Sequence, residues 1–348
     1  MKILVTGGAG FIGSHVCEFY ANSNKENEII CYDNLSRGTL LRKKISQRYN
    51  LNFLKNFSNV KFVRGDIRKF ENLKKVMRDA ELVIHAAAQT AVTSSVENPR
   101  TDFEINALGT FNVLEAARLS NNDPVVIYCS TNKVYGENVN SIKVNELEKR
   151  YEFSDKNFSE GIPENFPIDA KGHSPYGVSK LAGDQYCRDY FEVYGLKTLV
   201  FRMSCIYGTR QFGVEDQGWI AHFIISSIFE RPLTIYGNGK QVRDVLYVTD
   251  LVEAFHLGYE NINKFSGEVY NIGGGKTNTL SILELIEILR EYNLNPNYKF
   301  SSWRPSDQKV FISDISKAKK ELSWKPKISA KRGIKFLFEW VKENKNVF

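Results

Sequence analysis

Short apolar segments alternate with amphipathic segments along the first part of the chain. The apolar segments are rich in Val, Ile and Leu, and their length is typical of strands that are buried on both faces. The segments between them carry apolar residues at helical spacing. This pattern predicts β–α units in succession, with strands at residues 2–6, 28–32, 60–67, 82–85 and 125–129 and helices at 14–21, 70–79 and 100–120.

Consecutive β–α units predict an α/β fold with a doubly wound parallel sheet of the Rossmann type, which binds ligands at the C-terminal ends of its strands. A further helix from residue 175 and a sixth strand at 198–203 continue the pattern. Residues 137–173 are polar with little periodicity and are expected to be a functional or mobile loop. We predict a dinucleotide-binding domain at 1–204 and a smaller C-terminal, substrate-binding lobe at 205–348, interleaved with the sheet.

Elements of the C-terminal lobe are less distinct in the sequence. The apolar spacing predicts a helix near 217–230 and a pair of short strands at 233–236 and 241–247. Two more helices are expected at 249–260 and 279–292.

Composition and charge restrict the class of partner. The 348 residues are 42% hydrophobic and 13% aromatic, enough to fill a sizeable core. The net charge of +7 comes from scattered basic residues with local clusters, such as Arg42 to Lys44 and Lys317 to Lys320. We interpret these as a solvated surface, which also suits a small anionic substrate. No nucleic-acid-binding motif accompanies them, so no nucleic-acid partner is expected.

The sequence also bears on location and metal binding. The first residues are too poor in apolar side chains for a signal peptide, and no apolar run is long enough to span a membrane. We therefore expect a cytoplasmic protein without a membrane partner. The cysteines show no metal or disulfide spacing, which predicts free thiols in a reducing compartment and no bound metal: Cys17, Cys31, Cys129, Cys187 and Cys205.

A glycine-rich turn joins the first strand to the first helix. Gly7, Gly10 and Gly13 permit a tight turn, close approach of a pyrophosphate, and close packing of helix on strand. The phosphates would then meet N–H groups at the helix N-terminus. Asp33 ends the second strand, where an acid binds the ribose hydroxyls of adenosine and repels a 2′-phosphate, so NAD is favoured over NADP. For Arg37, two interpretations are equally consistent with the sequence: a contact to the ribose or a phosphate, and an ordinary surface arginine.

Other strand ends supply further candidates. Asp66 lies at the end of the third strand, where it could hydrogen-bond an adenine. The small residues Ala86 to Ala88 let a dinucleotide lie against the sheet, although close helix packing would explain them too. Ser130 and Thr131 end the fifth strand, where hydroxyls can align a substrate hydroxyl. His85 is expected to be a structural histidine.

A helix that begins at Pro175 carries the candidate proton-transfer pair. Proline suits the first turn of a helix because its φ is fixed and its missing N–H is not needed there. Tyr176 and Lys180 are four residues apart and project from one face. A phenol with a pKa of about 10 is a poor base at neutral pH. We expect the ammonium of Lys180 to lower the pKa of Tyr176, so that the pair exchanges a proton with a substrate hydroxyl.

Together these residues resemble the extended short-chain dehydrogenase/reductase family of nucleotide-sugar epimerases and dehydratases. The glycine turn, Asp33, Asp66, the Ser130-Thr131 pair and Tyr176-x-x-x-Lys180 match the family pattern. The resemblance extends over nearly the whole chain, through Asn106, Gln241 to Asp250, Tyr270 to Gly273 and Arg304 to Asp307.

Within the family, the chain most resembles the 2-epimerases that convert CDP-paratose to CDP-tyvelose. This likeness is carried by Ser130 to Gly136, the insertion after them, His173 to Tyr176, Arg210 to Phe212, Asp216 to Trp219 and Gly237 to Val245. It implies transient oxidation of the sugar at C2 by NAD, with hydride return to the opposite face. It also implies a homodimer or homotetramer that serves lipopolysaccharide O-antigen biosynthesis in the cytoplasm.

The resemblance further implies roles for individual residues. The catalytic set is Thr131, Tyr176 and Lys180. The cofactor set is Gly7, Gly10, Phe11, Ile12, Gly13, Asp33, Asn34, Ser36, Arg37, Asp66, Ile67, Ala86, Ala88, Asn106, Ser130, Tyr176 and Lys180. The substrate set is Gln89, Asn132, Ser204, Arg210, Gln211, Arg243 and Arg304, with the arginines Arg243 and Arg304 on the diphosphate. Many relatives carry Asn where this chain has Cys205, which leaves the usual amide contact to the substrate open.

Other functions remain as alternatives. A UDP-sugar 4-epimerase would use the same oxidation and re-reduction. A 4,6-dehydratase needs an acid and a base beside the threonine, and relatives with that chemistry carry Asp-Glu where this chain has Asn132 and Lys133. A dinucleotide sensor without catalytic activity is disfavoured by the intact Thr131, Tyr176 and Lys180.

Two helices carry apolar residues that suit an interface between subunits. The helices at 100–120 and 175–194 contain Phe103, Phe111, Leu114, Tyr190 and Phe191. We predict that they pair with their copies across a two-fold axis. The alternative is that both helix faces belong to the core.

Overall fold

The computed structural model describes residues 1–41, 47–169, 172–304 and 307–348. They form two compact units, each built from three segments of the chain. The basic cluster at 42–44 and residues 305–306 of the arginine motif lie outside the described residues, and the domain division predicted at residue 204 stays a prediction. The first unit comprises Met1–Thr131, Ser174–Arg202 and Val252–Tyr270, and the second comprises Asn132–His173, Met203–Leu251 and Asn271–Phe348.

A seven-stranded sheet runs through the first unit, and it confirms the predicted doubly wound fold. Its strands are β1 (Lys2–Thr6), β2 (Glu28–Asp33), β3 (Val60–Arg64), β4 (Leu82–His85), β5 (Val125–Thr131), β8 (Thr198–Met203) and β12 (Val269–Ile272). The order is β12-β8-β5-β4-β1-β2-β3. β1 pairs in parallel with β2 and β4, as β2 does with β3 and β4 with β5. β2 and β3 therefore lie on one side of β1, and β4 and β5 lie on its other side. Folds of this type bind ligands at the point where the strand order changes direction, which here is between β1 and β4.

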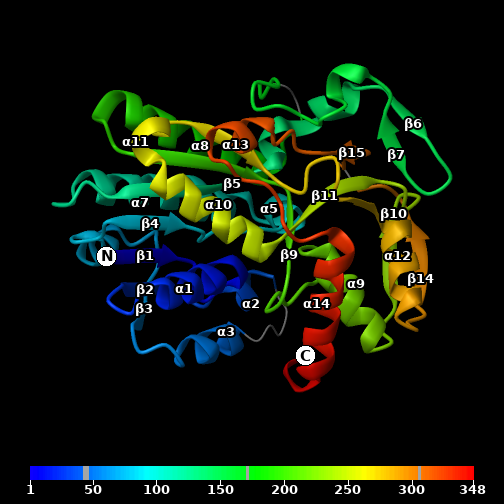
Figure 1. The fold of residues 1–348 in the computed structure, drawn as a ribbon, viewed down its shortest axis with the longest axis horizontal. Coiled ribbons are helices and arrows are strands. Elements are labelled where there is room, and N and C mark those ends of the chain that lie inside the picture. Colours follow the sequence, from blue (N-terminus) through cyan, green and yellow to red (C-terminus); the bar gives the residue numbers. More distant parts are fainter. Residues whose placement is uncertain (42–46, 170–171, 305–306) are drawn as a thin grey trace. The chain divides into compact units, whose positions relative to one another are not determined.

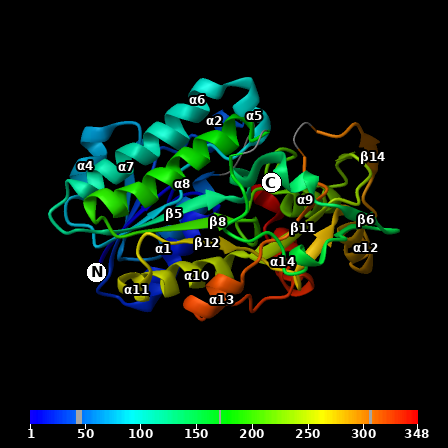
Figure 2. The same cartoon turned by 90° about the horizontal axis from the view of Figure 1, so that it is seen from above.

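Helices cover both faces of this sheet, so β4 and β5 are buried along their whole length. In Figure 2, α4, α7 and α8 lie along one face, and α1 and α11 lie on the other. Apolar residues of α7 and α8, among them Leu114 and Cys187, share a core cluster with Val83 and Val126 of the sheet. The helices are α1 (Phe11–Ser23), α2 (Arg37–Leu40), α3 (Gln47–Leu54), α4 (Phe70–Met77), α5 (Val92–Glu97), α6 (Pro99–Phe103), α7 (Gly109–Arg118), α8 (Ser174–Tyr194), α10 (Val248–Glu260) and α11 (Ile262–Phe265).

The helix predicted at 100–120 is divided into three parts. α6 and α7 are joined by a π-helical turn at Glu104–Leu108, with Asn106 at its middle. Such turns widen the helix locally and are found often at functional sites. Apolar periodicity does not distinguish them from an α-helix, so the sequence pattern predicts a single element.

The second unit is built from smaller sheets and helices (Figure 1). Its strands are β6 (Val144–Glu146), β7 (Tyr151–Phe153), β9 (Cys205–Tyr207), β10 (Leu233–Tyr236), β11 (Val242–Tyr247), β13 (Thr279–Ser281), β14 (Tyr298–Ser301) and β15 (Val310–Phe311). Its helices are α9 (Trp219–Ile228), α12 (Ile282–Glu291), α13 (Ser316–Glu321) and α14 (Ala330–Glu343), with 3₁₀ turns at Asn132–Ser141, Lys156–Phe158 and Lys345–Val347.

The strands predicted at 233–236 and 241–247 exist, but the prediction that they pair is wrong. β10 pairs in parallel with β14, and β11 pairs with β9, β13 and β15. Partners so distant in sequence leave no local signal. The helix predicted at 279–292 begins later for a local reason, because Ser281 and Glu284 form a reciprocal capping box that starts α12.

The segment 137–173 contains more regular structure than predicted. β6 and β7 form an antiparallel hairpin in which Val144 is opposite Phe153. Tyr151 of this hairpin packs with Val242 and Val310 in a small core cluster. The apolar residues of the hairpin are few and widely spaced, so they become recognisable only through these distant contacts.

Candidate functional site

The turn after β1 leaves no room for side chains at its glycines. Gly7 has a φ of +71°, and a Cβ on it would lie 2.7 Å from the backbone N of Ala87. A Cβ on Gly13 would lie 2.1 Å from the carbonyl O of Gly7. Gly10 is the N-cap of α1 and offers no side chain to the first N–H groups of that helix. The turn is therefore a cradle of backbone atoms at a helix N-terminus, which suits a diphosphate.

The neighbouring candidates lie at the same strand ends. Phe11 and Ile12 form the first turn of α1. Ala86 and Ala88 follow β4, and the N–H of Ala86 donates to the carbonyl O of Thr6 at 3.1 Å. The ends of β1 and β4 thus meet at the glycine turn.

Asp33 ends β2, as predicted for the ribose-binding acid. Its carboxylate accepts hydrogen bonds from the N–H groups of Ala9 at 3.1 Å and Leu35 at 2.7 Å. Burial raises the pKa of Asp33, and these two bonds oppose that shift. Ser36 and Arg37 begin the short helix α2, and burial lowers the pKa of Arg37 to about 10.

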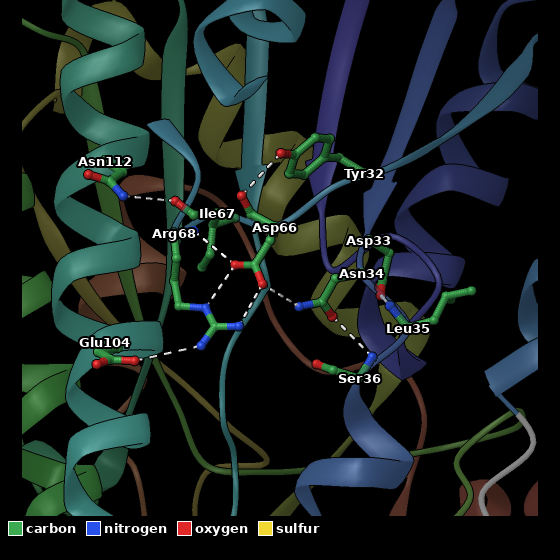
Figure 3. Close-up of polar contacts among 10 residues, drawn as sticks. All are labelled: Tyr32, Asp33, Asn34, Leu35, Ser36, Asp66, Ile67, Arg68, Glu104 and Asn112. Atoms are coloured by element: carbon green, nitrogen blue, oxygen red, sulfur yellow. Dashed lines mark hydrogen bonds and ion pairs between the residues drawn. The ribbon is translucent and has the colours of Figure 1, made fainter. Parts of the chain in front are cut away.

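Asp66 lies within a cluster of side chains that sequence analysis did not foresee (Figure 3). The Arg68 guanidinium donates to both of its carboxylate oxygens, from Nε at 3.0 Å and from Nη2 at 2.7 Å. Asn34 donates to the same carboxylate at 3.0 Å, and Glu104 lies 3.7 Å from Arg68. The hydrogen bond from Arg68 is the main reason that the pKa of Asp66 falls to about 2. The only local signal for this cluster is an arginine two residues after the predicted acid.

The backbone beside Asp66 is held from two other elements. Tyr32 of β2 donates its hydroxyl to the carbonyl O of Asp66 at 3.2 Å. Asn112 of α7 donates its amide to the carbonyl O of Ile67 at 2.9 Å. Asp66 and Ile67 therefore have a defined position at the end of β3.

Thr131 and Tyr176 are brought into contact by the fold. Thr131 is the last residue of β5, and Tyr176 lies in the first turn of α8. Their side chains are hydrogen-bonded to each other. Ser95 of α5 accepts a hydrogen bond from the N–H of Tyr176 at 3.1 Å, which holds this first turn in place.

The expectation that Lys180 lowers the pKa of Tyr176 is wrong. Burial raises the pKa of Tyr176 to about 12, the hydrogen bond from Thr131 opposes the shift, and the charge of Asp102 adds to it. The Lys180 Nζ lies 4.2 Å from the centroid of the Tyr128 ring. Spacing along a helix indicates which side chains share a face, whereas the phenol pKa depends on how far the fold removes that phenol from water.

Lys180 itself is 3% exposed. Burial lowers its pKa to about 8, and nearby groups, including Asp102 and Asp184, oppose that shift. Its ammonium therefore exchanges its proton close to neutral pH. The Tyr128 ring beneath it provides a cation–π contact in place of water.

The middle of α8 is anchored to the sheet by a buried ion pair. Arg202 of β8 donates to Asp184 from Nε at 2.8 Å and from Nη2 at 3.0 Å. Ser130, predicted to bind the cofactor, donates its hydroxyl to the same carboxylate at 2.9 Å. This network holds the helix of Tyr176 and Lys180 against β5 and β8.

Asn106 and Gln89 lie in one buried network. Asn106 accepts a hydrogen bond from the N–H of Gln89 at 2.9 Å and donates to the carbonyl O of that residue at 3.0 Å. The Gln89 amide donates to Asp102 at 2.8 Å and to the carbonyl O of Ala91 at 2.9 Å. Asp102 was not among the predicted site residues, although it precedes Asn106 by four residues and so shares its helix face.

The two arginines predicted to bind the diphosphate lie in the second unit. Arg243 of β11 donates to Asp307 at 2.6 Å. Arg304 donates to Asp216 at 3.3 Å, and its guanidinium lies 4.0 Å from the centroid of the Tyr236 ring. Arg304 and Asp307 line a cavity of about 830 Å³, a volume typical of small-molecule sites.

The remaining substrate candidates are distributed through the second unit. Asn132 and Arg210 are buried, with 8% and 6% of their surface exposed. Ser204 donates its hydroxyl to the carboxylate of Asp244, and the amide of Gln211 donates to a backbone carbonyl of β9.

Lys133, Cys205 and Arg243 form a cation-rich cluster. Burial raises the pKa of the Cys205 thiol, while Arg243 and Lys133 oppose that shift. Burial lowers the pKa of Lys133, and Arg243 adds to the effect. Cys205 contacts the Trp219 indole, so the position at which the amide contact was left open carries a partly buried thiol beside two cations.

His85 has the structural role that sequence analysis predicted. Its Nδ1 lies 2.7 Å from the hydroxyl of Thr6, and its Nε2 lies 3.0 Å from the hydroxyl of Thr110. Burial lowers its pKa to about 3, so the ring stays neutral at physiological pH.

Three findings concern the described residues as a whole. Within them, no three His, Cys, Asp or Glu side chains converge as a metal site would require. None of the helices in these ranges combines the length and apolar character needed to cross a bilayer. The five cysteines are free thiols, and all except Cys205 are buried.

Comparison with known proteins gives consistent results. Residues 3–273 match the NAD dependent epimerase/dehydratase family. CDP-paratose 2-epimerase of Salmonella typhi is 42% identical, over 98% of this chain and 99% of that protein. UDP-glucuronate 4-epimerase of Thermodesulfobacterium geofontis is 33% identical over 98% of this chain and 96% of its own. The structure of UDP-glucuronic acid 4-epimerase from Bacillus cereus, in complex with UDP-glucuronic acid and NAD, has a TM-score of 0.80 at 30% identity, covering 99% of both chains.

Proposed function

Since the chain belongs to the NAD dependent epimerase/dehydratase family, we propose that it is an NAD-dependent nucleotide-sugar epimerase that converts CDP-paratose to CDP-tyvelose at C2. The observation that carries this is the 42% identity to a CDP-paratose 2-epimerase over 98% of the chain. The contact between Thr131 and Tyr176 supports it, because the fold brings two hydroxyl groups together at the end of β5, a strand that is separated from β1 by β4 alone.

NAD fits the residues of the first unit. The N–H groups of Gly7, Gly8 and Gly10 donate within the protein, so the first turn of α1, which begins at Phe11, is proposed to offer its N–H groups to the diphosphate. Asp33 is assigned to the adenosine ribose. The proposed contacts are those predicted from the sequence, with Asp66 and Ile67 at the adenine. When bound, NAD supplies a reversible hydride acceptor. The remaining cofactor contacts are assigned to Gly7, Gly10, Phe11, Ile12, Gly13, Asn34, Ser36, Arg37, Ala86, Ala88, Asn106, Ser130, Tyr176 and Lys180.

The chain's own residues move the proton of the reacting hydroxyl. Tyr176 takes this proton as the sugar is oxidised to a ketone and returns it when the sugar is reduced. Thr131 orients the hydroxyl through its hydrogen bond with Tyr176. We assign the ammonium of Lys180 to the phenolate that forms once the substrate is bound. In the protein alone, burial dominates and raises the pKa of Tyr176 to about 12.

All of the proposed substrate contacts except Gln89 belong to the second unit. Arg243 and Arg304 are assigned to the diphosphate, since a guanidinium matches phosphate oxygens with two hydrogen bonds. Both now bond to carboxylates, so an anionic ligand would compete with Asp307 and Asp216. The other proposed substrate contacts are Gln89, Asn132, Ser204, Arg210 and Gln211.

The main alternative is a UDP-sugar 4-epimerase. It is supported only at the level of a related enzyme, through the 33% identity to a UDP-glucuronate 4-epimerase. A 4,6-dehydratase lacks support, because Asn132 and Lys133 replace the acid and base that water elimination needs.

Label retention at C2 tests the proposal. With CDP-paratose deuterated at C2, we expect CDP-tyvelose that keeps the deuterium, because the hydrogen leaves and returns within one turnover. NMR of the product measures both the label and the inverted carbon. Loss of the label to water would contradict direct return, and turnover of 4-epimer pairs alone would establish the alternative.

We also propose that the protein is a homodimer or homotetramer, formed through α6, α7 and α8. Phe103 and Phe111 are 59% and 37% exposed, and Val193 and Tyr194 of α8 are 67% and 55% exposed. Leu114 and Tyr190, which the sequence also suggested for this surface, are core residues instead. Exposed apolar patches on adjacent helices mark interaction surfaces. We expect sedimentation at micromolar concentration to give a dimer or larger species, and a monomer would refute the proposal.

The resemblance to the CDP-sugar 2-epimerases supports a cytoplasmic location and a role in O-antigen biosynthesis. In that role the product is an activated sugar for a glycosyl transfer reaction.

A further inference from the structure

Asp102 is a buried carboxylate that the proposed chemistry does not use. It is 1% exposed on α6. Its Oδ1 accepts hydrogen bonds from the Gln89 amide at 2.8 Å and the Asn106 amide at 3.0 Å, and its Oδ2 accepts one from the Ser179 hydroxyl at 2.5 Å. These three partners are neutral, so none of them cancels its charge. An ionised carboxylate in such surroundings is costly and calls for an explanation.

The bond to Ser179 leads directly to the proposed proton-transfer pair. Ser179 lies between Tyr176 and Lys180 in the same turn of α8, and its hydroxyl also lies 3.1 Å from the carbonyl O of Tyr176. On the other side, Gln89 belongs to the segment that follows β4, where the predicted cofactor site lies. Asp102 therefore joins the catalytic turn of α8 to that strand end.

The local helix geometry is unusual at this point. The π-helical turn Glu104–Leu108 begins two residues after Asp102. With this turn in place, Asn106 contacts Asp102 at 3.0 Å and Ser179 at 3.2 Å. Turns of this kind occur often at functional sites.

We propose that Asp102 is a positioning residue, which holds the turn of α8 that carries Tyr176 and Lys180 through its bond to Ser179. This inference rests on the proposed function. Ser95 fixes the backbone N–H of Tyr176 from α5, and Asp102 fixes the following residues of the same turn from α6. The phenol and the ammonium are thereby aligned before a substrate binds, which is the geometric requirement for efficient proton transfer.

The charge of Asp102 acts on the same two groups. It raises the pKa of Lys180 against the effect of burial, together with Cys129, Cys187 and Asp184. It also raises the pKa of Tyr176, to which Cys129 contributes in the same direction. Removing the charge should thus make Lys180 lose its proton at lower pH and let the Tyr176 phenolate form at lower pH.

Asp102→Asn tests the proposal, since it removes the charge and keeps the shape. We expect kcat to fall at least about tenfold, the scale of a misplaced catalytic group, with the KM for the sugar nearly unchanged. The alkaline limb of the kcat profile should move to lower pH, because the ammonium of Lys180 is lost earlier. Ser179→Ala removes the hydrogen bond to Asp102 but retains the charge of Asp102, so it should lower kcat by a similar factor. The double variant should lower kcat little further than either single variant.

A second readout does not depend on the substrate. The phenolate absorbance of Tyr176, obtained by subtracting the Tyr176→Phe titration, should appear at lower pH in Asp102→Asn. It should stay near its original position in Ser179→Ala. If no sugar is turned over, this titration still shows whether the charge of Asp102 acts on Tyr176.

Asp250→Asn is the matched control. Asp250 is a buried carboxylate of the second unit that accepts hydrogen bonds from the N–H groups of Lys327 and Ile328 at 2.9 Å. Its replacement should reduce thermal stability without moving the Tyr176 titration. The proposal is overturned if Asp102→Asn behaves like this control, or if Ser179→Ala retains full kcat.

Discussion

Replacing Tyr176 with phenylalanine is expected to lower kcat at least about a hundredfold, equivalent to about 2.7 kcal/mol in the activation barrier. Phenylalanine keeps the ring and its packing but removes the hydroxyl that accepts and returns the proton. The hydrogen bond with Thr131 is lost as well. NAD should still bind, because Tyr176 is one of many assigned cofactor contacts and the glycine turn and Asp33 are unchanged. Stopped assays on the proposed substrate and calorimetric titration with NAD measure the two effects.

Tyr190→Phe is the matched control for this experiment. Tyr190 lies on the same helix and donates its hydroxyl to Glu115 at 2.7 Å. Loss of this hydrogen bond in Tyr190→Phe should lower the free energy of unfolding by about 1 kcal/mol. The kcat should stay near that of the parent protein. Equal turnover in the parent and Tyr176→Phe would remove Tyr176 from the catalytic set.

Arg202→Ala should lower the free energy of unfolding by about 3–5 kcal/mol. The side chains of Arg202 and Asp184 are 2% and 0% exposed and meet through two hydrogen bonds. Removing the guanidinium leaves the Asp184 carboxylate buried with the Ser130 hydroxyl as a donor but without a cation in contact. Urea unfolding followed by circular dichroism measures the loss. Replacing both partners together, with Arg202→Met and Asp184→Leu, should recover much of it because no charge remains buried.

Arg118→Ala provides a control with the same bond geometry at the surface. Arg118 donates to Glu115 from Nε at 2.8 Å and from Nη2 at 2.9 Å, but its side chain is 34% exposed. Solvent screens such a pair, so Arg118→Ala should lower the free energy of unfolding much less than Arg202→Ala does. If Arg202→Ala were no more destabilising than Arg118→Ala, the ion pair would not anchor α8 as the structure suggests.

Much of the fold follows from local features of the sequence. Several strands of the central sheet, such as β1, β4 and β5, are largely apolar runs, and the glycine turn lies directly between β1 and α1. Asp33 and Thr131 are found at strand ends because strand length is itself visible in the apolar pattern. The positions of the candidate cofactor and proton-transfer residues could therefore be predicted without a structure.

Interactions between distant segments could not be predicted in this way. β10 and β14 pair across more than fifty residues of chain, and neither strand indicates its partner. Arg68 is close to Asp66 in sequence, but an arginine at that spacing occurs equally on surfaces. The Asp102–Ser179 hydrogen bond joins residues separated by 77 positions, so the sequence around Ser179 does not indicate it.

The amino-acid sequence alone determined the succession of β–α units from β1 to β5, the glycine cradle, and the helical face shared by Tyr176 and Lys180. These features depend on neighbouring residues, whose spacing is fixed by the covalent chain. Only the tertiary structure decided the direction of the pKa shifts, the partners of the strands in the second unit and the anchoring of α8 by Asp102, Asp184 and Arg202. Burial and charge contact arise when remote segments pack together, and that packing removes Tyr176 and Lys180 from water.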